Sequence, residues 1–228
     1  MYKSFIKRLF DVILSLIGII ILSPLMLILA LLVRIKLGKP VLFGQKRPGK
    51  NMEIKKYYKF RSMTDKKDKE GILLDDEIRL TAFGKKLRST SLDELPQLFD
   101  ILFGKMSIVG PRPQTIENIM FMNDKQKERQ NIIPGLTGWA QVNGRNNTTW
   151  DERIEYDLEY IEKQSFLFDL KIMFKTVSLV LSHDNVSQKT GNVQNVTFET
   201  MGIYLVRTGQ ITQEEYEKQR IIIKNTYY

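Results

Sequence analysis

Two adjacent carboxylates, Asp93 and Glu94, lie in a segment, LRSTSLDELPQL, whose residue types could carry out phosphoryl chemistry. An ionised aspartate can attack phosphorus, and a neighbouring glutamate can hold Mg²⁺, which prefers oxygen ligands and substrate phosphates. A simpler interpretation is that Ser91 and Glu94 form a helix capping box. Because Pro96 prefers a first helical turn, the helix could instead begin near Leu95. Both carboxylates would then lie at the positive end of its dipole, where ionisation is favoured.

A second segment, Gly110-Pro111-Arg112-Pro113, presents an arginine from a stiff backbone. Pro113 disfavours helical geometry at Arg112, and Pro111 has a fixed φ angle. A guanidinium held in this way suits bidentate binding of a phosphate group. The same residue types also make an ordinary turn, so this segment alone does not identify a binding site.

A third segment, PGLTGWAQVNGR, spans residues 134–145 and combines glycines with Arg145. Backbone amides of a Gly-rich loop can cradle an anion, and Arg145 can add positive charge. The signal is weak by itself, because such loops are common. The three segments nevertheless bring carboxylates, arginines and anion-binding backbone together in one chain.

The composition excludes several other kinds of catalytic site. The chain has 228 residues, no cysteine and a single histidine, His183. The sequence therefore provides no disulfide, no thiolate metal site, no cysteine nucleophile and no cluster of histidine ligands. No nucleophile motif accompanies His183, so a solvated linker residue is a better interpretation than a Ser-His-Asp triad. Chemistry should use carboxylates, hydroxyls, lysines or arginines, with or without a hard cation.

The net charge of the chain is +9, which predicts an anionic partner. Anionic membrane lipids are favoured, because a long apolar segment is present and basic residues near a membrane surface bind acidic headgroups. Nucleic acid is not expected, since no nucleic-acid-binding motif is recognisable.

The apolar segment Val12–Val33 contains no charged residue and is long enough to cross a membrane. Ser23-Pro24 at its centre predicts a kink or break, because proline lacks an N–H and clashes with the carbonyl four residues back. Basic residues flank both ends, and positive charge marks the cytoplasmic side. A re-entrant helix that turns at Ser23-Pro24, with the Ser23 hydroxyl bonding backbone at the turn, satisfies both facts. A kinked spanning helix fits the pattern equally well. A cleaved signal peptide is not expected, because the sequence after the apolar segment offers no small-residue cleavage site.

The remaining sequence predicts a mixture of short strands, helices and loops. Strands are expected over residues 40–45 and 53–63, and helices over 81–88, 96–103, 150–163 and 166–181. Loops are expected over residues 65–70, 104–115, 131–149 and 184–195. The apolar face of the helix over 166–181 fits either the protein core or the membrane interface. Thr212 and Glu215 predict the capping box of a final helix of about ten residues.

The order of these motifs closely resembles that of the bacterial sugar transferases, the monotopic phosphoglycosyl transferases. The resemblance rests on the apolar segment with Ser-Pro, followed by KFRSM, LRSTSLDELPQL, SIVGPRP and PGLTGWAQVNGR. It covers about residues 7–182. It implies a mostly α fold with a small β element (α+β), in which a re-entrant membrane helix broken at Ser-Pro and amphipathic interfacial helices accompany a compact cytoplasmic catalytic domain.

The resemblance also implies an organisation and a location. Residues 1–39 would form the membrane helix with its basic flanks, residues 40–182 the catalytic domain, and residues 183–228 a linker and helical tail. The protein would be monotopic, at the cytoplasmic face of the bacterial plasma membrane. A homo-oligomer is compatible with the sequence.

The activity implied by the resemblance is transfer of a phosphosugar from a UDP-sugar to undecaprenyl phosphate, as the first membrane step of glycan assembly. Asp93 would be the nucleophile that carries a covalent phosphosugar, with release of UMP, and Glu94 would bind Mg²⁺. The sequence does not specify which sugar is transferred.

Four cations would neutralise phosphate charge: Arg88, Arg112, Arg145 and, as a weaker candidate, Lys59. Asp157 is a further weak candidate for the site. Surface solvation is the alternative explanation for both Lys59 and Asp157. Two other functions fit the sequence, a non-catalytic basic scaffold at the membrane surface and a transferase that forms no covalent intermediate.

Overall fold

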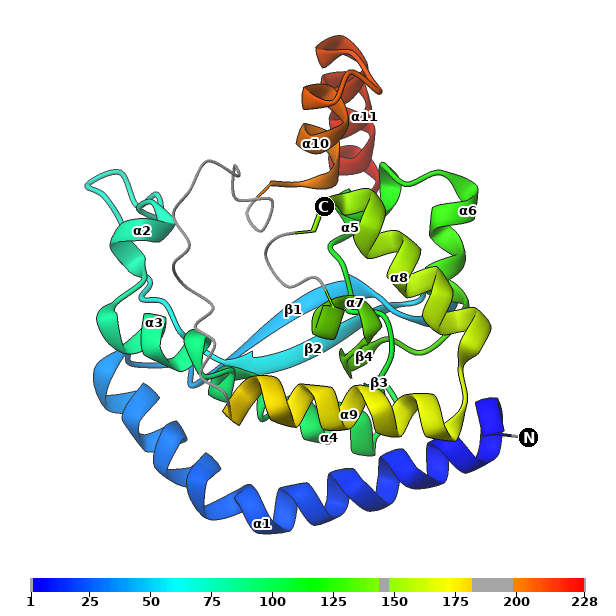
Figure 1. Ribbon diagram of the computed structural model, residues 1–228. Coiled ribbons are helices and arrows are strands. Elements are labelled where there is room, and N and C mark those ends of the chain that lie inside the picture. The colour runs from blue at the N-terminus through cyan, green and yellow to red at the C-terminus, as the bar shows by residue number, and fades with distance from the viewer. Residues whose placement is uncertain (1, 144–147, 182–198, 228) are drawn as a thin grey trace.

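The computed structural model describes residues 2–143, 148–181 and 199–227. The described chain is mostly helical with two small sheets, as predicted (Figure 1). The helices are α1 (Lys7–Lys36), α2 (Asp76–Arg79), α3 (Ala82–Ser89), α4 (Gln97–Leu102), α5 (Ile116–Met120), α6 (Asp124–Lys127), α7 (Trp139–Asn143), α8 (Trp150–Lys163), α9 (Phe166–Leu181), α10 (Met201–Arg207) and α11 (Gln213–Tyr227). The strands are β1 (Leu42–Pro48), β2 (Ile54–Phe60), β3 (Ser107–Val109) and β4 (Gly135–Thr137), and the short π or 3₁₀ turns are η1 (Tyr2–Ile6), η2 (Lys50–Met52), η3 (Leu92–Glu94) and η4 (Glu128–Asn131).

The apolar segment forms a single long helix, α1, which is long and apolar enough to cross a membrane by length and composition. Pro24 lies inside this helix and does not end it. The Ser23 hydroxyl donates to the carbonyl of Ile20 at 2.9 Å, which is the kind of backbone partner that the sequence suggested. Figure 1 shows α1 bowed beneath the rest of the molecule, so the helix bends without an interruption. The re-entrant topology stays a prediction.

The first turns of α1 are fastened to the folded domain by polar side chains. Arg8 donates to the carbonyls of Ile101 and Leu102, at 2.6 and 2.7 Å, and so satisfies the carboxyl end of α4. The Asp11 carboxylate accepts from the backbone N–H of Ile108 in β3 at 2.9 Å. These bonds tie the amino end of the apolar helix to the centre of the domain.

The carboxyl end of α1 is fastened to the same domain. Arg61, which follows β2, donates to the carbonyl of Leu37. Val33 has no exposed surface and packs in a cluster with Phe60 and Leu87. Both ends of α1 therefore contact one globular body, which lies on one side of the bow (Figure 1).

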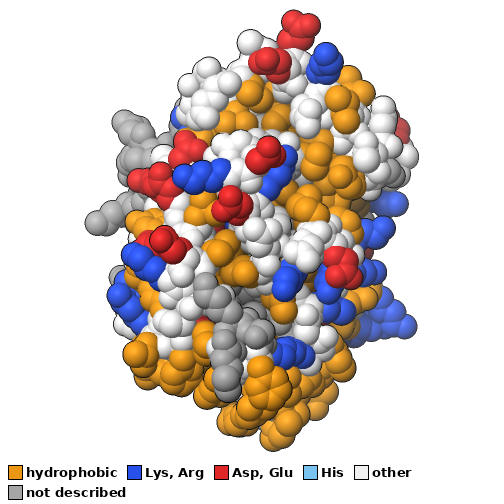
Figure 2. All heavy atoms as spheres, turned by 90° about the vertical axis from the view of Figure 1, so that its right-hand side faces the viewer, with side chains coloured by type: hydrophobic (Ala, Val, Ile, Leu, Met, Phe, Trp, Pro, Cys, Tyr) orange, Lys and Arg blue, Asp and Glu red, His pale blue; other side chains and the backbone are white. Residues whose placement is uncertain are grey.

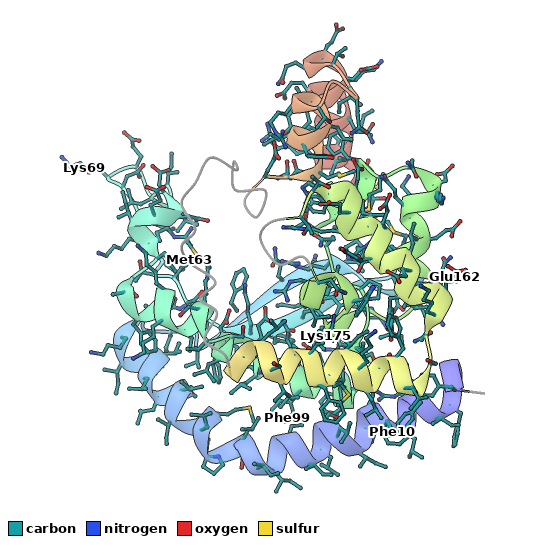
Figure 3. All side chains as sticks on the ribbon, in the orientation of Figure 1. Phe10, Met63, Lys69, Phe99, Glu162 and Lys175 are labelled. Atoms are coloured by element: carbon teal, nitrogen blue, oxygen red, sulfur yellow. The ribbon has the colours of Figure 1, made fainter. Side chains whose placement is uncertain are left out.

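The underside of the molecule is apolar. Figure 2 shows hydrophobic side chains gathered at the bottom, where α1 lies, with charged side chains above them. Phe10 of α1 and Phe99 of α4, both labelled in Figure 3, are 38% and 42% exposed. The other large, exposed apolar residues of α1 are Leu9, Ile13, Leu16, Ile17, Ile20, Ile21, Leu27, Ile28, Leu31 and Ile35. A continuous surface of this kind is typical of a membrane contact.

Helix α9 has features of both a core helix and a helix at the membrane interface, the two alternatives that its sequence allowed. Ile172 is fully buried, and Asp169 forms a 2.6 Å ion pair with Lys7 of α1. The opposite face exposes Leu167 and Phe174, which are 76% and 72% exposed. The helix therefore packs on the core with one face and adds its other face to the apolar surface, as an interfacial helix would.

Strands β1 and β2 form an antiparallel hairpin in which Gln45 pairs with Tyr57 and Phe43 with Lys59. Both strands were predicted. Because side chains alternate between the two faces of a strand, Gln45, Arg47, Tyr57 and Lys59 share one face of this sheet. That face carries most of the polar residues described below.

Strands β3 and β4 form a short parallel pair that the sequence analysis assigned to loops. The pair needs glycine, since a Cβ atom at Gly135 would lie 2.1 Å from the backbone nitrogen of Gly110. The Gly135 N–H donates to the carbonyl of Pro111 at 2.9 Å. This N–H therefore cannot cradle an anion, and the glycine serves close packing of the two motifs.

The tail packs on the domain through α10. Met201 is fully buried in a cluster with Ile119, Trp150 and Ile154. The Thr212 capping box is present, with the Thr212 N–H donating to Glu215 at 2.7 Å, and the helix that it begins extends to Tyr227. The proposed linker at 184–195 lies outside the described residues.

Candidate active site

Asp93 and Glu94 lie in a tight turn between α3 and α4. Ser91 adopts the left-handed conformation with φ of 55°, which is uncommon for a residue with a side chain and costs backbone energy. Its side chain caps no helix, so the capping box of Ser91 and Glu94 was wrong. The two carboxylates instead lie in the 3₁₀ turn η3, and Pro96 is the N-cap of α4, close to the second arrangement that the sequence allowed.

Asp93 is buried, with 4% of its surface exposed. Among the described residues, no hydrogen-bond donor contacts its carboxylate. Burial, together with the negative charge of Glu94, raises the pKa of Asp93 to about 6. The expectation that a helix dipole favours ionisation here was wrong for this carboxyl, because the loss of solvation outweighs it. At neutral pH the carboxylate is still mostly ionised, and no hydrogen bond from a described residue reduces its nucleophilicity.

Glu94 has a different environment. Arg112 grips it with both terminal nitrogens, one of them at 3.4 Å, in a bidentate ion pair. Burial alone would raise the pKa of Glu94, but the charge and hydrogen bond of Arg112 lower it below its usual value. The Arg112 side chain is 44% exposed, so one side of the guanidinium still faces solvent. Two neighbouring carboxylates with pKa values moved apart are typical of a catalytic pair.

Arg88 is positioned by the KFRSM motif. Its Nε donates to the Ser62 hydroxyl at 2.8 Å, and its Nη2 lies 2.9 Å from the sulfur of Met63, which is labelled in Figure 3 beside α3. The positive charge of Arg88 lowers the pKa of Asp93, after burial and Glu94 have raised it. Arg88 therefore acts electrostatically on the Asp93 carboxylate.

A pocket opens beside Glu94. Its wall on the sheet side consists of Gln45, Arg47, Tyr57 and Lys59, and its other wall consists of Glu94, Gln97, Arg112 and Pro113. The sequence analysis missed Gln45, Arg47, Tyr57 and Gln97. Strand alternation between Gln45, Arg47, Tyr57 and Lys59 was the available signal, because it places all of them on the face that carries the predicted candidate Lys59.

The loop that carries Arg112 is braced from behind. Arg129, in η4, donates to the carbonyl of Arg112 at 2.8 Å and pairs with Asp157 of α8 at 2.6 Å. Arg129 and Asp157 are 2% and 5% exposed. Asp157 thus does not line the pocket but supports a residue that does, and surface solvation does not explain it. Surface solvation is also wrong for Lys59, which lines the pocket.

The structure therefore gathers Asp93, Glu94, Arg88, Arg112 and Lys59 into one site. Arg145 lies outside the described residues. Among the described residues, no group of three or more histidine, cysteine, aspartate or glutamate side chains forms a metal site. Mg²⁺ can bind through one or two carboxylates plus substrate phosphates, so the pair of Asp93 and Glu94 fits this ion chemically.

Comparison with known sequences decides the family. The sequence profile of the bacterial sugar transferases matches residues 2–183, which is most of the chain. The chain belongs to the bacterial sugar transferase family. The predicted membership, and with it the predicted class of enzyme, is confirmed at the level of the family. The site described above lies within the matched residues of this sugar transferase.

Named relatives agree with this assignment. The chain is 43% identical over 197 residues to an uncharacterized sugar transferase, EpsL, of Bacillus subtilis, an alignment that covers 86% of this chain and 97% of the relative. It is 44% identical over 181 residues to a UDP-glucose:undecaprenyl-phosphate glucose-1-phosphate transferase of Klebsiella pneumoniae, covering 75% of this chain and 39% of the relative. It is 38% identical over 199 residues to an undecaprenyl-phosphate galactose phosphotransferase of Salmonella typhimurium, covering 80% and 42%.

The relatives differ in length and in the sugar that they are named for. This sugar transferase spans nearly the whole of the Bacillus relative but about two fifths of the Klebsiella and Salmonella relatives. The names of the latter two share undecaprenyl phosphate and differ between glucose and galactose. Membership of the family therefore does not specify which sugar is transferred.

Proposed function

We propose that the protein transfers a phosphosugar from a UDP-sugar to undecaprenyl phosphate through a covalent intermediate on Asp93. The observation that carries the proposal is the buried carboxylate of Asp93, which accepts no hydrogen bond from a described residue, next to the arginine-paired Glu94 that lines a cationic pocket. The named relatives that act on undecaprenyl phosphate support the two substrates.

The reaction has two displacements at one phosphorus atom. In the first, an Asp93 oxygen bonds to the phosphorus that carries the sugar, and the bond from that phosphorus to the bridging oxygen breaks. UMP leaves with the electron pair of that bond. In the second, a phosphate oxygen of undecaprenyl phosphate bonds to the same phosphorus, and the bond to Asp93 breaks. The products are the undecaprenyl diphosphate sugar and a regenerated Asp93 carboxylate.

The cations of the site stabilise negative charge that develops during both steps. Arg88 and Lys59 lie near Asp93, and Arg112 faces the pocket from a braced loop. Preorganised donors of this kind stabilise a transition state by roughly several kcal/mol. The ion pair with Glu94 orients the Arg112 guanidinium at the pocket.

We also propose that Glu94 holds Mg²⁺ together with the substrate phosphates. The ion would neutralise phosphate charge and make UMP a better leaving group. Its lowered pKa keeps Glu94 anionic, as a metal ligand must be. Turnover should therefore stop in excess chelator and return when Mg²⁺ is added back, and undiminished turnover in chelator contradicts this role of Glu94.

The membrane placement is part of the proposal. The apolar underside formed by α1 and α9 would enter the cytoplasmic leaflet of the plasma membrane, where anionic lipids attract the basic flanks. Both ends of α1 are bonded to the same globular body, which favours a re-entrant helix over a spanning one. The site then lies between a soluble donor and a membrane-bound acceptor.

The decisive experiment is to mix the purified protein with a UDP-sugar, without acceptor, and to measure UMP release and protein mass. We expect one equivalent of UMP and a mass increase of one phosphosugar at Asp93. Asp93→Asn should give neither, whereas Asp124→Asn, which changes an exposed carboxylate in α6, should behave as the wild type. UMP release only when acceptor is present, with no adduct, contradicts the covalent mechanism. No UMP with any UDP-sugar and acceptor favours the non-catalytic scaffold.

A further inference from the structure

Tyr57 has an unusual position for a polar side chain. The residue is 4% exposed and lines the pocket beside Glu94. Its hydroxyl is buried and has no hydrogen-bond partner among the described residues. The ring end is closely confined, since a Cβ atom at Gly49 would lie 2.8 Å from the hydroxyl oxygen. Burying a hydroxyl without a partner is unfavourable, so a hydrogen-bond partner supplied by a ligand would be favourable.

Arg47 lies on the same sheet face and has donors to spare. It donates from Nε and Nη2 to the Gln45 side-chain oxygen, at 3.2 and 2.9 Å, and from Nη1 to the carbonyl of Pro113. Because each terminal nitrogen carries a second N–H, donors remain for a ligand. These bonds also hold the guanidinium at the point where the β1–β2 sheet meets the arginine loop.

The pocket has a surplus of positive charge. Of the residues that line it, Arg47, Lys59 and Arg112 are cations, and Glu94 is the one carboxylate in the described set. Burial, and then the charge of Arg112, lowers the pKa of Arg47 to about 10. The positive charges of Arg47 and Arg112 repel each other. An anion with at least two accessible oxygens could bind both guanidiniums and relieve this repulsion.

We propose that Tyr57 and Arg47 form a second phosphate subsite, next to the phosphate that Asp93 attacks. In the first half-reaction it would hold the phosphate of the departing nucleotide, and in the second it would hold the phosphate of the incoming lipid. This inference rests on the proposed function, because it assumes a covalent phosphosugar on Asp93.

One subsite can serve both substrates because of the direction of displacement. In phosphoryl transfer the attacking and leaving oxygens lie roughly in line on opposite sides of phosphorus. The nucleotide therefore leaves from the side opposite Asp93, and the lipid phosphate must attack from that same side to release Asp93. The two phosphates occupy one place in turn, and neither needs a separate pocket.

The test is Tyr57→Phe, which removes only the hydroxyl. Tyr58→Phe is the matched control, because Tyr58 is the next residue of β2 and lies on the opposite face of the sheet. For a reaction with two half-steps, kcat/KM for each substrate reports on its own half-reaction. We expect Tyr57→Phe to lower kcat/KM for UDP-sugar and for undecaprenyl phosphate, each by about tenfold, and to weaken inhibition by UMP by a similar factor. Tyr58→Phe should change none of these.

Thermal unfolding separates a ligand contact from a structural role. Because the hydroxyl has no partner among the described residues, Tyr57→Phe should unfold at the same temperature as the wild type or higher. Arg47→Lys, which keeps the charge but loses the planar fork, should lower both kcat/KM values as well. Equal kinetics in Tyr57→Phe and Tyr58→Phe overturn the subsite, and a fall confined to one substrate overturns its shared use. These comparisons are made with an active wild type. A negative result here therefore contradicts the second subsite, whereas a missing adduct contradicts the proposed covalent mechanism.

Discussion

At the scale of single residues, two adjacent carboxylates acquire opposite properties from their neighbours. Glu94 is paired with Arg112 and stays anionic, whereas Asp93 is buried without a described partner and has a raised pKa. The motifs singled out Asp93, Glu94, Arg88, Arg112 and Lys59, which the structure brings together, although their catalytic roles stay predictions. The motifs did not indicate the other pocket residues Gln45, Arg47, Tyr57 and Gln97. The sequence could not predict the difference between the two carboxylates, since burial and pairing depend on residues distant in the chain.

The raised pKa of Asp93 predicts how adduct formation depends on pH. Only the carboxylate attacks, so the rate of UMP release in the first half-reaction should rise through a pKa of about 6 and then level off. Rapid-quench measurement of UMP over a pH range that brackets the inflection tests this, and a rate that does not change between about pH 5 and pH 7 contradicts it.

The same shift predicts that Asp93→Asn stabilises the protein. The folded state holds the pKa above its usual value of 3.8, so ionisation costs more in the folded than in the unfolded protein. The wild type therefore loses stability as pH rises from about 4 to about 6, by up to about 3 kcal/mol. Asn at this position avoids that loss.

Thermal unfolding at two pH values measures the effect. The unfolding temperature of Asp93→Asn should exceed that of the wild type above about pH 6, and the two should converge near pH 4. A variant that is less stable than the wild type at neutral pH is inconsistent with a buried, unpaired carboxylate. Such a result would indicate that a partner stabilises the charged form of Asp93.

At the scale of elements, regular patterns were predictable and close backbone packing was not. The alternating residues of β1 and β2 and the helical spacing of α8 gave these elements nearly correct bounds. Strands β3 and β4 are three residues each and lie in segments rich in glycine and proline, which read as loops. Their pairing depends on contact between Gly110 and Gly135, which only the folded chain brings together.

The brace behind the arginine loop gives an element-scale prediction. Asp157→Asn leaves the buried Arg129 guanidinium without its counter-charge, so it should lower stability by about 3 to 5 kcal/mol. Glu155→Gln changes an exposed carboxylate on the same helix and should have little effect. Unfolding in denaturant measures both. Nearly equal stabilities of the two variants contradict a structural ion pair.

A double variant separates stability from positioning in the same brace. Replacing Arg129 by Met and Asp157 by Leu removes both buried charges, so much of the lost stability should return. The carbonyl of Arg112 still loses its donor in the double variant. We therefore expect the KM of the double variant for UDP-sugar to be higher than that of the wild type. Recovery of stability and KM together indicates that Arg129 does not position the loop.

At the scale of the whole molecule, the arrangement of α1 joins an apolar underside to a polar site. Arg8 and Arg61 fix its two ends to the domain that contains Asp93, while the residues between them expose the apolar surface. The sequence indicated a membrane segment from composition and a bend from Pro24. It could not show that both ends bind one body, because Arg8 and Arg61 each donate to backbone carbonyls that are distant from them in the chain.

This arrangement predicts that both ends of α1 face the same aqueous compartment. The chain has no cysteine, so single cysteines can be introduced without removing others. Phe5 and Lys39 are exposed and flank the helix, and Ile20, which is 65% exposed, lies on its apolar face. Phe5→Cys and Lys39→Cys should react with a membrane-impermeant maleimide in inside-out vesicles and not in right-side-out ones. Ile20→Cys should stay unlabelled in both.

Asp124→Cys, in the folded domain, is the reference for the side on which that domain lies. A re-entrant helix requires that Phe5→Cys, Lys39→Cys and Asp124→Cys give one pattern of labelling. A spanning helix would place the cysteine at position 5 opposite the other two, and it would have to break the bonds of Arg8 to α4 to do so. Because leaving those carbonyls without donors in a membrane setting costs several kcal/mol, we expect the common pattern.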